Sequence, residues 1–379
     1  MHIVFLPAWY PNRNDDMEGL FVRKHALAVA AHHKVDVLFL KAEPNLKEPQ
    51  FEHFEHGNLR EHYIYYPRGN NKVCMVLRFF ALYRSGIKHI MKEYGKPDLV
   101  HAHVLDGNSF MALWTKYRYH IPYVVTEHWT RYLRNDFKSY LHRFLTKWLA
   151  RKAQWIMPVS EDLGKAMRKC GVKGNYQQVS NVVDDFFFQN ISPASVSNCK
   201  TILHICCFSE AAKNNFGLLR TVKKLSETRS DFKLLMVGDG KDRAATQAYA
   251  EHLQLPQNSV VFIGKLQPPE IKKALNDCSF SVLFSNYENQ PVVICESLAC
   301  GKPVVATHVG GIPELINETN GITVPVQDET ALYHALNRML DTYQTYDSAD
   351  ISHRAEEFSF ARVGEKYSRI YQSAVSKSK

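Results

Sequence analysis

Short apolar runs alternate along the chain with longer stretches in which apolar residues recur every three or four positions. The runs predict strands and the stretches predict helices, because these spacings match the two side-chain periods. The predicted strands are at 2–6, 35–40, 98–103, 123–126, 155–160, 201–206, 234–237, 260–266, 281–284 and 303–306. Strands that alternate with helices in this way predict an α/β fold built on doubly wound sheets.

The succession of strands and helices starts afresh near residue 200, which predicts two lobes. Residues 1–185 form the first predicted lobe and residues 200–357 the second. Between them, residues 186–199 have the mixed composition, with Ser and Pro, that is typical of a linker. A last amphipathic helix is predicted at 358–375. With 379 residues, the chain is long enough for two separate cores.

Residues 138–152 predict a helix that is both aromatic and strongly basic. Its apolar positions are Tyr140, Leu141, Phe144, Leu145, Trp148 and Leu149, and its cations are Lys138, Arg143, Lys147, Arg151 and Lys152. We expect the apolar stripe to pack on the sheet, as in an ordinary amphipathic helix. The alternative is a helix that lies in a membrane interface, and a mixed arrangement would leave only the basic rim in contact with lipid.

The net charge of +9 is confined to the first half of the chain. Residues 1–185 hold 27 Lys and Arg against 18 Asp and Glu, whereas residues 186–379 hold 20 of each. The first lobe is therefore expected to face an acidic partner. Because the chain shows no zinc-finger spacing, RNA-recognition signature or helix-turn-helix, an anionic membrane surface or a phosphate-bearing acceptor is favoured over nucleic acid.

The composition indicates a soluble protein of a reducing compartment. Apolar residues make up 45% of the chain and charged residues 22%. The eight cysteines include no C-x-x-C pair and no metal-ligand spacing, which favours reduced thiols in the cytosol. The opening apolar strand is too short for a signal peptide and lacks its basic start. No apolar run approaches the ~20 residues that a membrane-spanning helix needs.

The densest group of candidate site residues lies in 285–314. Glu288 precedes a predicted helix that begins near Pro291, and Glu296 lies about two turns into it, so both carboxylates can face one crevice. Residues 289–291 are expected to supply backbone N–H groups at the positive end of this helix, where phosphate oxygens are stabilised. Such a site suits a sugar nucleotide, although two glutamates around a helix start are also common where no ligand binds.

This stretch resembles the donor-site signature of glycosyltransferase family 4, the retaining transferases with the two-lobed GT-B fold. The residues that carry the resemblance are Glu288, Asn289-Gln290-Pro291, Glu296-Ser297-Leu298-Ala299-Cys300-Gly301, Lys302-Pro303-Val304-Val305-Ala306-Thr307, Gly310-Gly311 and Glu314. Many family members have glycine where this chain has Asn289. The resemblance implies two Rossmann-like lobes that face a central cleft, with the C-terminal helix, residues 358–379, crossing back to the first lobe.

The same resemblance implies a donor site in the second lobe. Glu288 would hold hydroxyls of the donor sugar, and Glu296 those of the ribose. The diphosphate would lie against the residues at the helix start and a lysine before the first helix of the lobe, namely Asn289, Gln290, Pro291, Val292 and Lys213. The base would contact Gly264, Lys265 and Leu266. An arginine that the family usually carries a few residues before this lysine is missing, since Cys206-Cys207-Phe208 stands there.

In the first lobe, the candidate residues lie at the ends of predicted strands, in the first loop, or near the end of the lobe in sequence. His103 and His128 end strands, where ligands of doubly wound folds bind. A lone histidine at such a position is more often a structural hydrogen-bonding group, but His128 resembles the family's histidine beside the transferred sugar and is therefore ranked above His103. Gly19 resembles part of the first loop over the cleft, and Asn181 belongs to a segment that resembles the end of the first lobe.

The predicted function is retaining transfer of a sugar from a UDP or GDP sugar to an acceptor hydroxyl, with Glu288 and His128 as catalytic residues. The expected acceptor is a saccharide or lipid-linked saccharide of a bacterial surface polysaccharide or glycolipid. The nucleotide sugar is a co-substrate, and no cofactor or metal is expected because no D-x-D pair lies in a suitable loop. A cytoplasmic location is expected, with peripheral contact to the inner face of the membrane left open. The alternatives are a sugar-nucleotide 2-epimerase of the same fold and a basic membrane- or nucleic-acid-binding protein.

Overall fold

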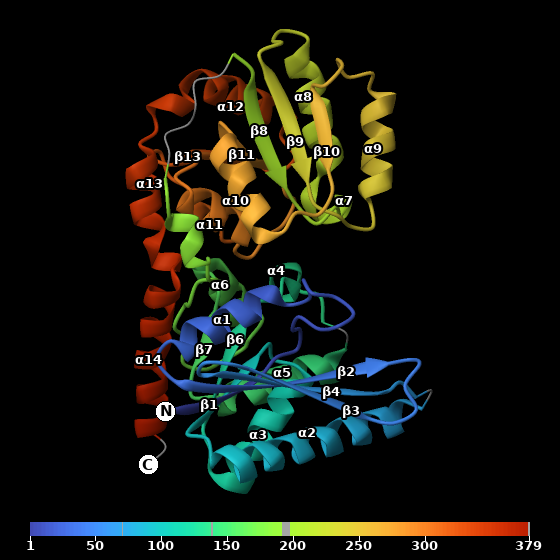
Figure 1. Cartoon of the computed structure of the whole chain (residues 1–379), viewed down its shortest axis with the longest axis vertical. Helices are drawn as coiled ribbons and strands as arrows, with labels where there is room; N and C mark the ends of the chain where they lie inside the picture. The colour runs from blue at the N-terminus through green and yellow to red at the C-terminus, as the bar shows by residue number, and fades with distance from the viewer. Residues whose placement is uncertain (70, 138, 192–197, 378–379) are drawn as a thin grey trace. The chain divides into compact units, whose positions relative to one another are not determined.

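The protein, seen here as a computed structural model that describes residues 1–69, 71–137, 139–191 and 198–377, divides into two compact units (Figure 1). The first unit consists of residues 1–182 and the C-terminal helix α14 (Phe360–Ser376), and the second of residues 183–359. Each unit has its own sheet, and parallel pairing dominates both. The prediction of two doubly wound lobes, with the last helix returning to the first, is confirmed.

The sheet of the first unit has seven strands in the order β3-β4-β2-β1-β5-β6-β7. The strands are β1 (His2–Leu6), β2 (Lys34–Glu43), β3 (Gln50–His56), β4 (Leu59–Pro67), β5 (Leu99–His103), β6 (Tyr123–Glu127) and β7 (Ile156–Pro158). All neighbours are parallel except β3, which runs antiparallel to β4. The chain builds outward from β1 to one edge and returns at β5, so the switch point, where ligands of such sheets bind, lies between β1 and β5.

Helices cover both faces of this sheet. They are α1 (Leu20–Ala30), α2 (Lys72–Tyr94), α3 (Gly107–Tyr119), α4 (Arg131–Arg134), α5 (Tyr140–Lys152), α6 (Glu161–Lys169) and α14. Successive side chains of a strand point to opposite faces, and β1 shows the division. Ile3 and Phe5 join the core under α1 and α14, whereas Val4 and Leu6 join the core under α2, α3, α5 and α6.

The second unit has a fully parallel six-stranded sheet in the order β10-β9-β8-β11-β12-β13. The strands are β8 (Lys200–Ile205), β9 (Phe232–Val237), β10 (Val260–Ile263), β11 (Phe280–Leu283), β12 (Val304–Thr307) and β13 (Gly321–Val324). The helices are α7 (Glu210–Lys213), α8 (Asn215–Ser226), α9 (Arg243–His252), α10 (Pro268–Asp277), α11 (Val292–Ala299), α12 (Glu329–Thr342) and α13 (Ser348–Ala355), with 3-10 turns at η1 (Asp185–Phe188), η2 (Ile312–Glu314), η3 (Tyr343–Thr345) and η4 (Glu356–Phe358). Here the switch point lies between β8 and β11.

The segment expected to be a linker, residues 186–199, begins as packed structure in the second unit. Phe187 of η1 is fully buried in the core beneath α10, α11 and α13, and Val183 donates a backbone hydrogen bond to Phe358. Residues 192–197 of the expected linker lie outside the described residues. The run of three phenylalanines at 186–188 explains why the chain is held here, since burial of such a side chain contributes about 2 kcal/mol.

The orientation of α5 differs from the expected packing of its apolar stripe on the sheet. The helix buries Thr146, Leu149 and Ala150, whereas Tyr140 is 93% exposed and Phe144 62% exposed. Leu149 belongs to the predicted apolar stripe and is buried as expected, whereas the aromatic side chains Tyr140 and Phe144 lie on the exposed side. Lys138, the first cation of the predicted helix, lies outside the described residues. No helix of the described ranges is long and apolar enough to cross a membrane.

Candidate donor and histidine sites

An ion pair between Lys213 and Glu288 lies at the switch point of the second sheet. Lys213 ends α7 in the loop region after β8, and Glu288 lies in the loop after β11. The Lys213 ammonium donates a hydrogen bond to Glu288 Oε1, and the Ser285 hydroxyl donates to the same oxygen at 2.8 Å. Burial alone would lower the pKa of Lys213, but the Glu288 carboxylate outweighs burial and the net shift is upward. The sequence predicted both residues, and the fold brings them together across 75 positions.

The Glu288 loop is held in place by backbone contacts to the rest of the motif. Asn286 donates its N–H to the Ala212 carbonyl at 2.7 Å, and Gly311 donates to the Asn289 carbonyl at 2.7 Å. Gly310 has φ +57, and a Cβ at this position would lie 1.8 Å from the Glu288 carbonyl oxygen. Only glycine fits here, because any side chain would push the Glu288 backbone away. The glycine pair therefore sets the position of the carboxylate.

The other residues of the predicted donor site come after β10 and β11, at the carboxyl ends of these parallel strands. Asn289, Gln290 and Glu296 are buried, with exposed fractions of 7%, 6% and 6%. Pro291 is the N-cap residue of α11 and Val292 its first residue, so the N–H groups of the first helical turn are directed toward this loop. Gly264, Lys265 and Leu266 directly follow β10, and Lys265 is exposed. Cys207, where the family's arginine was sought, is exposed.

Four histidines of the first unit lie together beneath α14. His103 Nδ1 and His128 Nε2 are 3.1 Å apart, and the two rings stack with centroids 5.4 Å apart. His25 Nε2 lies 3.3 Å from Asn181 Oδ1, and the His25 ring lies 5.3 Å from that of His128. His101 is the fourth member, stacked on His103 at 4.3 Å. The predicted residues His103, His128 and Asn181 are thus neighbours, whereas His25 and His101 were not predicted.

Burial keeps these imidazoles neutral. It lowers the pKa of His25 to about 4, with a partly opposing hydrogen bond to Asn181. Burial lowers the pKa values of His101, His103 and His128 well below the usual range, and neighbouring histidines lower them further. A protonated cluster would place several positive charges side by side in a low-dielectric site. His128 therefore offers one donor and one acceptor nitrogen at neutral pH, and no positive charge.

Two tyrosines of α14 extend the histidine cluster. Tyr367 Oη lies 3.1 Å from His25 Nδ1 and 3.1 Å from Thr126 Oγ1. Thr126 Oγ1 lies 2.7 Å from His101 Nε2, and Tyr371 Oη lies 2.7 Å from His101 Nδ1. The alternation of His101 and His103 along β5 would have shown that both face the same side. Nothing in the sequence pairs His101 with Tyr371, which lies 270 positions later.

The loop that carries His128 is anchored by the fully buried carboxylate of Glu127. Its Oε1 accepts the backbone N–H groups of His128 and Trp129 at 3.0 Å each. Its Oε2 accepts the Leu105 N–H and the Tyr132 hydroxyl, also at 3.0 Å. Burial raises the pKa of Glu127, and these hydrogen bonds oppose the rise. Glu127 was not predicted as a site residue; its contacts hold the loops that follow β5 and β6 together.

Gly19 also has a local structural role. It is the N-cap residue of α1 with φ +65, and a Cβ would lie 2.3 Å from the Trp9 carbonyl carbon. The close approach that requires glycine is thus one within the chain itself. Across the described ranges, no group of three or more His, Cys, Asp or Glu side chains is arranged to hold a metal ion.

Comparison with known families gives two matches that together cover most of the chain. A family model described as Glycosyltransferase Family 4 matches residues 21–185, and one described as Glycosyl transferases group 1 matches residues 199–342. Among curated proteins, the N-acetylgalactosamine-N,N'-diacetylbacillosaminyl-diphospho-undecaprenol 4-alpha-N-acetylgalactosaminyltransferase of Campylobacter jejuni is 28% identical over 224 residues. That match covers 55% of this chain and 57% of the relative, so the chain spans little more than half of the relative's length.

Solved structures share the fold at low sequence identity. Sucrose-phosphate synthase from Thermosynechococcus elongatus aligns over 100% of both chains with a TM-score of 0.80 and 18% identity. HepE of Anabaena, solved in complex with UDP, aligns over 98% of this chain and 100% of its own with a TM-score of 0.76 and 16% identity. These structures support the two-lobed GT-B fold that the resemblance implied.

Proposed function

The chain belongs to the group 1 glycosyltransferases, and we propose that it transfers a sugar from a nucleoside diphosphate to an acceptor hydroxyl. The observation that carries this proposal is the Lys213–Glu288 pair at the switch point of the second sheet. It combines a largely buried cation for phosphate, with a side chain that is 14% exposed, and a buried carboxylate for hydroxyl groups. The pair lies at the end of the sheet where nucleotides bind in this class of fold.

Lys213 is proposed to bind the donor diphosphate. Its ammonium exchanges Glu288 for phosphate oxygens, which are comparably strong charged acceptors. The first-turn N–H groups of α11, next to Gln290, add the positive end of the helix dipole. Because negative charge develops on the departing diphosphate, a cation fixed there lowers the barrier to transfer. With no arginine at Cys207, more of this stabilisation depends on Lys213.

Glu288 is proposed to bind the donor sugar once Lys213 turns to the phosphate. Ser285 continues to donate to its Oε1, which leaves Oε2 for a sugar hydroxyl. Glu296, buried in the second turn of α11, is proposed to accept hydrogen bonds from the ribose hydroxyls, and residues 264–266 to contact the base. The UDP bound to HepE makes a uridine nucleotide the first donor to test, with GDP as the comparison.

His128 is proposed to orient a substrate hydroxyl as a neutral hydrogen-bonding group. Its low pKa, caused by burial, argues against a role as a cationic acid at neutral pH. We propose retention at the anomeric carbon, with the departing phosphate assisting deprotonation of the acceptor, and no requirement for a metal ion. The Campylobacter relative is named for a substrate linked to diphospho-undecaprenol, so we propose a lipid-linked saccharide as acceptor.

Calorimetric titration of UDP and GDP into three proteins tests the proposal. Lys213→Met should weaken binding of the preferred nucleotide about 10- to 100-fold, the range for one charged hydrogen-bond partner. Lys273→Met is the matched control, because Lys273 of the same unit also pairs with a carboxylate but is exposed. Glu288→Gln should bind the nucleotide as tightly as wild type or tighter, because it removes the competing carboxylate, yet it should not transfer sugar. Equal affinities for Lys213→Met and wild type would refute the assignment.

A further inference from the structure

Helix α5 presents its largest apolar side chains to solvent. Tyr140, Leu141, Phe144 and Trp148 have exposed fractions of 93%, 65%, 62% and 36%. Spaced by one, four and eight positions, they fall within about 100° of the helix circumference and form a single stripe. A contiguous stripe of this kind marks an interaction surface, whereas scattered exposed apolar side chains do not.

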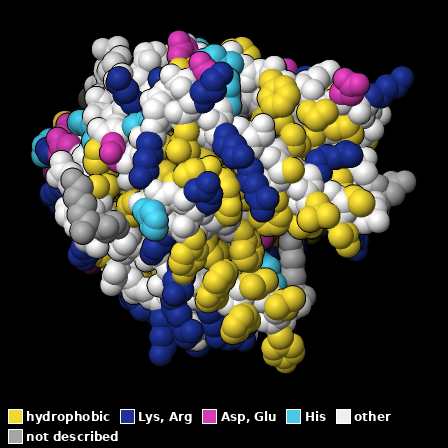
Figure 2. Space-filling view, turned by 90° about the horizontal axis from the view of Figure 1, so that it is seen from below, with side chains coloured by type: hydrophobic (Ala, Val, Ile, Leu, Met, Phe, Trp, Pro, Cys, Tyr) yellow, Lys and Arg dark blue, Asp and Glu magenta, His cyan; other side chains and the backbone are white. Residues whose placement is uncertain are grey.

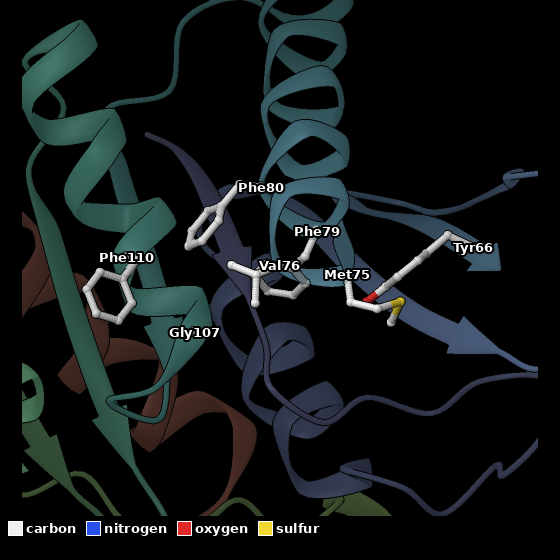
Figure 3. Close-up of a pocket in the computed structure, with 7 residues that line it drawn as sticks. All are labelled: Tyr66, Met75, Val76, Phe79, Phe80, Gly107 and Phe110. Carbon is white, nitrogen blue, oxygen red and sulfur yellow. The ribbon is translucent and has the colours of Figure 1, made fainter. Parts of the chain in front are cut away.

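The apolar surface continues from α5 across α3 to α2. The Phe110 ring of α3 lies 6.4 Å from the Trp148 ring. Phe110 also lines a groove of about 540 Å³ together with Val76, Phe79 and Phe80 of α2, which lie across from it in Figure 3. At the start of α2, Val73, Val76 and Leu77 are 67%, 52% and 64% exposed. We call this continuous area the α2–α3–α5 surface.

Cations surround the α2–α3–α5 surface. The three helices carry eleven Lys and Arg and a single acidic residue, Glu93. Lys147 and Arg151 follow Phe144 by three and seven positions, so they lie on the same side of α5 as the stripe. Neither they nor Lys88 form an ion pair with an acidic side chain of the described residues. Figure 2 shows hydrophobic side chains gathered on one face with Lys and Arg side chains among them.

We propose that the α2–α3–α5 surface docks on an anionic lipid bilayer. Phe144 and Trp148 would enter the headgroup region, where aromatic side chains are favoured. Lys147, Arg151 and Lys88 would bind lipid phosphates. The proposal follows the membrane-interface alternative left open for residues 138–152. It differs from the mixed arrangement, because the aromatic side chains of α5 are exposed together with Arg151.

Charge and side-chain type favour a bilayer over other occupants. A second copy of the chain would bring two strongly basic surfaces together, which costs free energy. A single-stranded nucleic acid could stack on the aromatic side chains, but it would leave the aliphatic Val73, Leu77 and Leu141 in water. A bilayer covers both kinds of side chain and supplies the negative charge. This inference goes beyond the donor site and does not depend on which sugar is transferred.

Flotation with vesicles tests the proposal on the full chain. Vesicles of 30% phosphatidylglycerol in phosphatidylcholine should carry the protein upward, vesicles of pure phosphatidylcholine should carry much less, and high salt should release it. Lys147→Gln/Arg151→Gln should weaken partitioning about thirtyfold. Leu141→Ser/Phe144→Ser should weaken it about tenfold or more at low salt.

Matched control variants distinguish binding through this surface from nonspecific adsorption to vesicles. Phe51→Ser removes an equally exposed aromatic side chain on β3, and Arg369→Gln removes an exposed cation on α14; both should float like wild type. Absence of flotation with anionic vesicles, or equal losses in the control variants, would overturn the proposal. A dimer in solution that dissociates on Leu141→Ser/Phe144→Ser substitution, without vesicle binding, would assign the surface to a second copy instead.

Discussion

Acidification between pH 6.5 and pH 4 should weaken the first unit through its buried histidines. In the folded state burial holds the pKa of His25 at about 4, against 6.5 when the side chain is exposed. In this window the unfolded chain binds a proton that the folded unit does not bind, so the free energy of unfolding falls as the pH falls. The stability is fully present above pH 6.5 and is lost progressively on the way to pH 4.

The size of the loss in unfolding free energy follows from the pKa shift of His25. A pKa difference of that size corresponds to about 3 kcal/mol for His25 alone, and about 2 kcal/mol of this should be lost by pH 5. His101, His103 and His128 shift in the same direction for the same reason, so they add to the loss. Their contributions are coupled, because a proton on one ring disfavours a proton on the next.

Urea unfolding followed by tryptophan fluorescence measures this effect selectively. All five tryptophans, at 9, 114, 129, 148 and 155, lie in the first unit. The free energy of unfolding of wild type should fall by several kcal/mol between pH 7.5 and pH 5. His25→Gln should be less stable than wild type at pH 7.5, but its free energy of unfolding should fall by about 2 kcal/mol less over the same range. An unfolding free energy that does not change with pH, or a slope that is identical in His25→Gln, would refute the reasoning.

Three further predictions concern the second unit, the C-terminal helix and the metal question. Gly310→Ala should keep the fold but displace the Glu288 loop, because its Cβ would meet the Glu288 carbonyl. Calorimetry should show that the affinity for the donor nucleotide is reduced about tenfold or more. The control variant Gly57→Ala, at a position with positive φ and open space, should leave that affinity unchanged. Tyr371→Phe removes the hydroxyl that bonds His101 and should cost about 1 kcal/mol in the fluorescence-detected transition; a loss below 0.3 kcal/mol would show that water replaces the hydroxyl. Sugar transfer should be unchanged by EDTA, and loss of activity that Mg²⁺ or Mn²⁺ restores would contradict the metal-free proposal.

The strands were predictable because a doubly wound sheet buries both of its faces, which turns strands such as β1 and β12 into continuous apolar runs. The edge strand β3 was not predicted with its bounds, because its sequence Gln50–His56 is almost entirely exposed and polar. Periodicity also identified α5 as amphipathic, but the expectation that its apolar stripe packs on the sheet was wrong for the aromatic side chains. The side with Thr146, Leu149 and Ala150 packs on the unit and the aromatic side chains do not. Which side packs is determined by tertiary structure.

The donor site was largely predictable because its residues are close in sequence. Glu288 to Glu296 form one loop and helix start, and Gly310 returns to the same loop. Lys213 was found by resemblance alone, since nothing local connects it with Glu288. The histidine cluster was only half predicted. His103 and His128 end strands, but His25 and the tyrosines of α14 reach the cluster through folding, and no spacing in the sequence brings them together.

The most direct test of the central claim is transfer itself. Purified wild type, Glu288→Gln and Lys273→Met should each be incubated with a panel of UDP and GDP sugars and an undecaprenyl-diphosphate-linked saccharide, with the product and the released nucleoside diphosphate both quantified. We predict that wild type and Lys273→Met transfer one sugar with equal rates and release one nucleoside diphosphate per product, with retained anomeric configuration, and that Glu288→Gln is slower by at least about 100-fold. Equal rates for Glu288→Gln and wild type would contradict the account, and so would conversion of the donor without a glycosylated product.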